Sequence, residues 1–121
     1  MKFAHVGVCA TDTRELADWY VRVLEFERVS ENTNDRPTIF VASPDGAQLE
    51  IYPADTAGAP TDNKVQGLRH LGFATTEIED WAGRLAEHGV EIVDPPRTHP
   101  NGATTLFFRD GEGNLLHFVQ R

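Results

Sequence analysis

The chain has 121 residues, which suits one compact domain, and 40% of them are hydrophobic, which is enough for a core without a disulfide or structural metal. Its net charge of −8, with no run of basic residues, disfavours nucleic acid and anionic membranes as partners. No apolar run is long enough to cross a membrane, and residues 1–5 lack a signal-peptide pattern. The lone cysteine, Cys9, cannot form an internal disulfide, so we expect a cytoplasmic location.

The first half of the chain predicts one helix and four strands. A β-rich run at residues 3–9 is followed by Asp12, with Glu15 three residues later, a capping-box pattern that predicts the start of a helix. Further strands are expected at residues 26–30, 38–42 and 48–52. The apolar residues at helical spacing, which predict the buried stripe of the helix, are Leu16, Trp19, Tyr20, Val23 and Leu24.

The second half repeats this order. A strand at residues 68–74 precedes Thr76, the expected helix cap, and Gly89 stands where a glycine would end that helix. Strands are then expected at residues 90–93, 104–108 and 115–120. The predicted helix stripe comprises Ile78, Trp81, Ala82 and Leu85. Between the halves, residues 54–66 are polar and contain proline and glycine, which predicts a linker.

Local sequence matches indicate an internal duplication. His5-Val6-Gly7-Val8 matches His70-Leu71-Gly72-Phe73, and residues 46–52 match residues 113–119 in the same order. We therefore predict an α+β fold made of two βαβββ modules, residues 1–53 and 67–121. If each sheet curls, the eight strands would form an open half-barrel with the helices outside.

Four residues with metal-binding side chains occupy equivalent positions in the two modules. Strand alternation predicts that His5, Glu50, His70 and His117 all lie on the sheet face opposite the helix. Three imidazoles and one carboxylate suit Zn²⁺, Ni²⁺, Co²⁺, Fe²⁺ or Mn²⁺, whereas Ca²⁺ and Mg²⁺ prefer oxygen ligands. A lone histidine on a strand is more often an ordinary polar residue than a ligand. Four such residues at repeated positions favour one metal site.

At these residues the chain resembles the vicinal oxygen chelate superfamily, which includes glyoxalases, bleomycin-resistance proteins and extradiol dioxygenases. The resemblance covers nearly the whole chain, as a single domain over residues 1–121. It implies that His5, Glu50, His70 and His117 hold one divalent metal, which binds two adjacent substrate oxygens. The similarity rests on the His5 and His70 strands, the helix motif Leu16–Trp19-Tyr20–Leu24, Pro44-Asp45-Gly46 before Leu49-Glu50, and residues 110–114.

Two departures from the superfamily pattern affect the expected activity. His117 stands where the family usually has glutamate, which leaves Glu50 as the only carboxylate among the four positions. Cys9 and Ala54 stand where bacterial glutathione-dependent glyoxalases have arginine and asparagine. The lactoylglutathione reaction is therefore not expected.

Three functions remain open from the sequence. The first is a metal-dependent isomerase, epimerase or lyase in which Glu50 moves a proton. The second is a non-haem Fe(II) extradiol-type dioxygenase. The third is a binding protein that sequesters a natural product.

A small, partly apolar substrate is expected in each case, and a homodimer is expected because open strand edges need covering. Module pairing within one chain or across two chains is left open. The predicted substrate-binding residues are Cys9, Gln48, Tyr52, Leu68, Leu115 and Val119.

Overall fold

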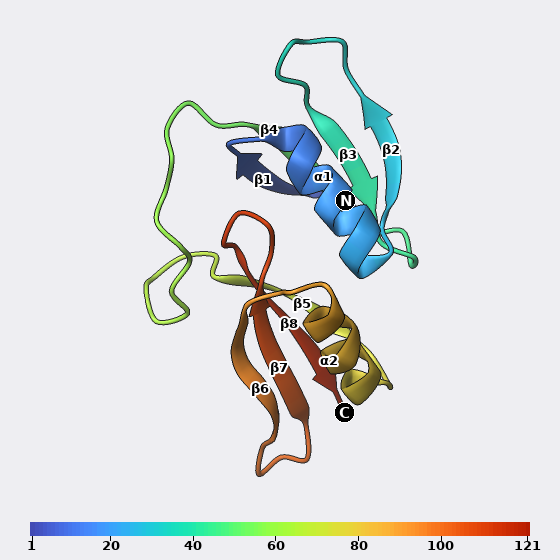
Figure 1. Cartoon of the computed structure of the whole chain (residues 1–121), viewed down its shortest axis with the longest axis vertical. Helices are drawn as coiled ribbons and strands as arrows, with labels where there is room; N and C mark the ends of the chain where they lie inside the picture. Colours follow the sequence, from blue (N-terminus) through green and yellow to red (C-terminus); the bar gives the residue numbers. More distant parts are fainter. The chain divides into compact units, whose positions relative to one another are not determined.

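The computed structural model describes residues 1–121, with the elements in the order β1–α1–β2–β3–β4–β5–α2–β6–β7–β8 (Figure 1). It divides into two compact units, Met1–Gly58 and Ala59–Arg121, and the division falls within the predicted linker. Each unit has one helix and one four-stranded sheet, which confirms the predicted α+β class and the two βαβββ modules. Neither helix is long and apolar enough to span a membrane.

The first unit forms a sheet in the order β1-β4-β3-β2. Strand β1 runs parallel to β4, whereas β3 is antiparallel to both β4 and β2. Helix α1 follows β1 in the chain and packs against β3 and β4. The elements are β1 (Val6–Ala10), α1 (Thr13–Leu24), β2 (Glu27–Glu31), β3 (Ile39–Ala42) and β4 (Gln48–Pro53).

The second unit repeats that topology, with strand order β5-β8-β7-β6. Strand β5 is parallel to β8, and β7 is antiparallel to both of its neighbours. Identical strand order and direction in both units agree with a duplicated module. The elements are β5 (His70–Ala74), α2 (Ile78–Glu87), β6 (Ile92–Thr98), β7 (Thr104–Arg109) and β8 (Leu115–Gln120).

The core of the first unit is built as the helical spacing predicts. Asp12 caps α1, and its side chain accepts the Glu15 backbone N–H at 3.1 Å. All five predicted stripe residues are buried. Burial of a large apolar side chain contributes roughly 1.5–3 kcal/mol, so this packing fixes which sheet face lies against the helix. The sheet residues fully buried with the stripe are Ala10, Ile39, Val41 and Ile51.

The core of the second unit uses aromatic stacking. Trp81 of α2 stacks on Phe118 of β8, with ring centroids 4.7 Å apart. Phe118 also stacks on Phe108 at 5.3 Å. These contacts hold Phe118 against the helix, and Leu116 two residues earlier is also buried, so His117 between them faces the other way. The fully buried residues here include Leu85, Leu106, Phe108 and Leu116.

The start of α2 differs from its prediction, because Thr76 does not cap the helix. The helix begins at Ile78, and Glu77 at the cap position makes no side-chain cap bond. Instead Gln120 at the end of β8 accepts the Ile78 N–H at 2.9 Å. The Thr75 hydroxyl accepts the Glu77 N–H at 3.0 Å. The Ile78 N–H, which a residue next to the helix start would ordinarily cap, is thus bonded by Gln120, a residue distant in sequence.

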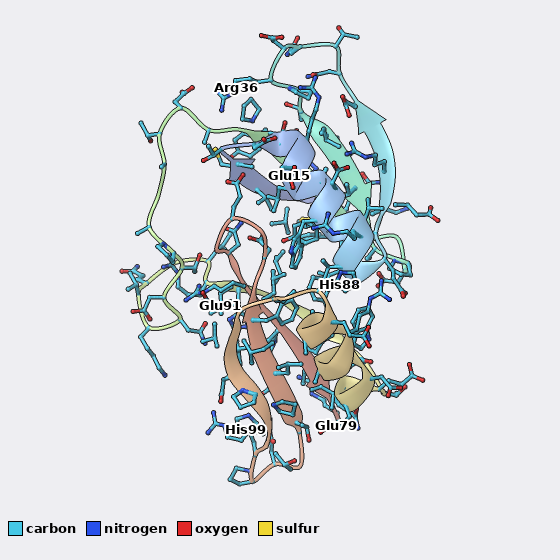
Figure 2. All side chains as sticks on the ribbon, viewed as in Figure 1. Glu15, Arg36, Glu79, His88, Glu91 and His99 are labelled. Atoms are coloured by element: carbon cyan, nitrogen blue, oxygen red, sulfur yellow. The ribbon has the colours of Figure 1, made fainter.

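Strand β6 extends further than predicted, through Pro95 and Pro96 to Thr98. It tolerates both prolines because it is the edge strand of its sheet and its register is irregular. His99 follows the strand, next to the β6–β7 turn (Figure 2). It is half-buried, and its Nε2 lies 2.7 Å from the Thr105 hydroxyl.

Candidate metal centre

The first unit brings His5 and Glu50 together. Their Nε2 and Oε1 atoms lie 3.8 Å apart, and the side chains are 40% and 33% exposed. Glu50 lies in β4 between buried Leu49 and Ile51, so it points to the sheet face opposite α1. His5 does not lie within the strand as predicted: it immediately precedes β1, because the ladder with β4 begins at Val6.

The second unit brings His70 and His117 together. His70 is the first residue of β5, and His117 lies in β8 beside buried Leu116 and Phe118. The two imidazole centroids are 4.6 Å apart, with planes at 62°. The pair therefore also lies on the face away from the helix.

The two pairs stand in the same register in their sheets. Across the parallel β1–β4 ladder Glu50 is paired with Gly7, the residue two positions after His5. Across the β5–β8 ladder His117 is paired with Gly72, two positions after His70. Each module thus places a histidine and a second potential ligand at corresponding points, as the duplication requires.

An aromatic residue supports each histidine, and sequence reasoning missed both. Phe40 of β3 pairs with Glu50 and meets the His5 ring edge-on, with centroids 5.5 Å apart. Phe107 of β7 pairs with His117 and meets the His70 ring edge-on, also at 5.5 Å. The signal was present, because Thr38-Ile39-Phe40-Val41 and Thr105-Leu106-Phe107-Phe108 are similar segments of the two modules.

The His117 imidazole has an incomplete set of partners. Its Nδ1 is buried without a hydrogen-bond partner, which typically costs about 1–3 kcal/mol. Burial, and then repulsion from the positive charges of His70 and Arg121, holds the pKa of His117 below its ordinary range. The neutral form is therefore favoured, and this is the form that binds a metal. Both properties, together with the imidazole and carboxylate donors, fit a transition-metal ion.

A single pair does not make a complete metal site. No group of three or more His, Cys, Asp or Glu side chains in the structure is arranged to hold a metal ion. Each unit by itself supplies two donors, whereas structural and catalytic zinc sites use three or four protein ligands.

The predicted substrate-binding residues differ widely in exposure. Cys9 is exposed, Tyr52 is 38% exposed, and Leu68 is 91% exposed. Leu115 is only 4% exposed, which leaves almost no surface for a ligand. Gln48 and Val119 are half-buried. These assignments remain predictions.

Gly72 leaves room for the His117 ring, and this contact can be tested. A Cβ at Gly72 would lie 2.6 Å from His117 Nε2 and 3.0 Å from its Cδ2. Gly72→Ala should therefore displace the imidazole and weaken Zn²⁺ binding, measured by competition with a chelator. Loss of ligand orientation typically costs about 10–100-fold in metal affinity.

Gly83→Ala provides the matched control for this test. Gly83 lies in α2, where an added Cβ meets nothing within 4 Å. The control should bind Zn²⁺ normally and unfold at a slightly higher temperature, since alanine favours helix by roughly 1 kcal/mol over glycine. Normal Zn²⁺ affinity in the Gly72 variant would exclude this role for the glycine.

The comparisons with known proteins bear on the whole chain. The family model of the Glyoxalase/Bleomycin resistance protein/Dioxygenase superfamily matches residues 2–118. The chain belongs to this superfamily. Predicted membership is thereby confirmed, and with it the expected βαβββ architecture.

Solved structures of other proteins share this fold. The glyoxalase family protein from Enterococcus faecalis is 29% identical, with a TM-score of 0.81 over 98% of this chain and 96% of that one. The fosfomycin resistance protein FosX from Listeria monocytogenes is 18% identical, with a TM-score of 0.81 over 100% of this chain and 93% of that one. The latter likeness concerns the fold alone.

One enzyme is similar in sequence. Biphenyl-2,3-diol 1,2-dioxygenase 2 from Rhodococcus globerulus is 25% identical over 117 residues, which cover 95% of this chain. The match covers 60% of the dioxygenase, so this chain spans about three-fifths of the length of that relative.

Proposed function

We propose that this protein is a metal-dependent enzyme with one divalent transition-metal ion bound by His5, Glu50, His70 and His117. The observation that supports it best is the matched register of the two pairs: the second residue of each pair stands opposite a glycine two positions after the histidine. Chance placement of one histidine on a strand is common. Two pairs of metal-binding side chains at corresponding sites of a duplicated module are better explained by a shared ligand.

The chemistry of these donors suggests the metal. Imidazole nitrogens combined with one carboxylate suit Zn²⁺, Ni²⁺, Co²⁺, Fe²⁺ or Mn²⁺. When bound, such an ion polarises a substrate carbonyl and acidifies the neighbouring C–H. We propose an isomerase, epimerase or lyase reaction on a small carbonyl compound with two adjacent oxygens.

Glu50 is the residue proposed to move the proton. It is the only carboxylate of the four, and its side chain is one-third exposed, so it has access to a substrate. The three histidines are poorer bases when their lone pairs bind a metal. A carboxylate beside them can accept a proton from carbon and return it to the neighbouring position, as general acid–base catalysis requires.

An extradiol-type Fe(II) dioxygenase is the second candidate. The similarity to biphenyl-2,3-diol 1,2-dioxygenase 2 over 95% of this chain supports it. Two histidines with one carboxylate suit that chemistry, because they leave positions open for oxygen and substrate. A fourth protein ligand, His117, would leave fewer such positions.

Metal analysis followed by two assays separates the candidate functions. Protein purified without added metal should contain one transition-metal ion per site. The first assay incubates the protein with an α-hydroxy ketone in D₂O. For an isomerase, epimerase or lyase, the NMR signal of the C–H beside the carbonyl should disappear as deuterium replaces the proton, and no oxygen should be consumed. Oxygen uptake with catechol and Fe²⁺ would instead favour the dioxygenase. Tight binding of a natural product with neither reaction would favour the sequestering protein.

A further inference from the structure

A residue of the predicted linker contacts one of the candidate ligands. The Oδ1 atom of Asn63 lies 2.7 Å from Nδ1 of His70. An amide oxygen can only accept a hydrogen bond, so Nδ1 of the neutral imidazole must carry the proton. The lone pair of that imidazole is then on Nε2. The first-unit histidine, His5, has no such amide partner; its polar contact is with Glu50.

The backbone just before Asn63 is bonded to β7, and local hydrogen bonds form a turn around Asn63 itself. Arg109 of β7 donates from Nη1 to the Thr61 carbonyl at 2.6 Å. The Asp62 side chain accepts the Lys64 N–H at 2.9 Å, which stabilises a turn around Asn63. The Asp62 carbonyl also accepts the Val65 N–H at 3.3 Å. Asn63 is therefore presented to His70 by a segment with its own fixed hydrogen bonds.

Arg109 is itself well held, so it can act as an anchor. Its Nη1 also donates to the Gly113 carbonyl at 3.2 Å, and its Nε lies 3.7 Å from the Glu91 carboxylate. Its side chain is only 19% exposed. The segment that carries Asn63 is thus connected to β7 and to the β7–β8 turn.

We propose that Asn63 is a positioning residue that selects the Nδ1-protonated tautomer of His70 and so presents Nε2 as the metal-binding atom. This inference rests on the proposed function, in which His70 is a ligand. A metal-binding histidine commonly donates its other ring N–H to an oxygen acceptor, which fixes the ring and raises its basicity. In the second unit Phe107 restrains the His70 ring from one edge, and Asn63 restrains it through a directional hydrogen bond.

The experiment compares Asn63→Leu, which removes the acceptor at similar volume, with Asn63→Asp, which keeps an oxygen at the same place. The control is Asn34→Leu, at another exposed asparagine in the first unit. The first readout is the ¹⁵N NMR signature of His70 in metal-free protein, at a pH where imidazole is neutral. The second is Zn²⁺ affinity, measured by competition with a chelator.

We expect wild type, Asn63→Asp and Asn34→Leu to have a protonated Nδ1 and an unprotonated Nε2 at His70. Asn63→Leu should give a mixture of tautomers and bind Zn²⁺ about 10–100-fold more weakly. A wild-type His70 protonated at Nε2, or an unchanged tautomer and affinity in Asn63→Leu, would overturn the inference. Failure of wild type to bind Zn²⁺ would overturn the proposed function, whereas the NMR comparison in metal-free protein would still decide the role of Asn63.

Discussion

Glu50→Gln should retain most of the bound metal and lose nearly all turnover. The other three proposed ligands, His5, His70 and His117, are unchanged, and the glutamine amide has the same shape as the carboxylate. It cannot accept a proton from carbon, however, because an amide is far less basic than a carboxylate. A general base contributes typically ~10²–10⁴-fold to rate, so turnover should fall by that order. Metal content and turnover should be measured on the same preparation.

His117→Glu should be measured alongside Glu50→Gln, because it changes a proposed ligand without removing the proposed base. It introduces the residue that the superfamily usually has at this position, and it should preserve both the fold and metal binding. The Nδ1 atom of His117 is buried without a hydrogen-bond partner, so replacing this imidazole breaks no hydrogen bond of that atom and should not destabilise the metal-free protein on its account.

Normal turnover of metal-loaded Glu50→Gln would show that Glu50 is not the base, and would strengthen the dioxygenase or binding-protein alternatives.

The double variant His5→Ala, His70→Ala should lose its metal without unfolding. It removes one imidazole from each pair, which leaves Glu50 and His117 as the only proposed ligands. Both replaced residues are exposed, and neither belongs to the buried cores. Such surface substitutions usually change stability by no more than about 0.5 kcal/mol. Elemental analysis should find essentially no transition metal, while the unfolding temperature of the metal-free protein should be nearly unchanged.

His88→Ala is the matched control for the double variant. His88 is also an exposed histidine, but it lies at the end of α2 (Figure 2) and takes no part in either pair. It should bind metal like the wild type. Full metal occupancy in the double variant would contradict the assignment of the ligands, whatever reaction the protein catalyses.

Several features of the candidate site could be predicted from local periodicity. The α1 stripe is buried as the helical spacing indicates, and alternation in β4 and β8 correctly separates Glu50 and His117 from the helix-facing residues. The equivalence of His5 and His70 follows from matching sequence segments. These inferences succeed because side-chain direction depends only on position along a strand or helix. The complete four-ligand site, the homodimer and the cytoplasmic location stay predictions.

The sequence by itself therefore determined the duplicated βαβββ module, the buried face of each sheet and the residue pairs with metal-binding side chains. The tertiary structure decided which groups surround them: Phe107 beside His70, Asn63 on its Nδ1, and Gln120 at the start of α2. Each of these contacts joins residues whose proximity depends on strand register or on the path of a connecting segment. Periodicity specifies the direction of a side chain, but only the folded chain specifies its partner.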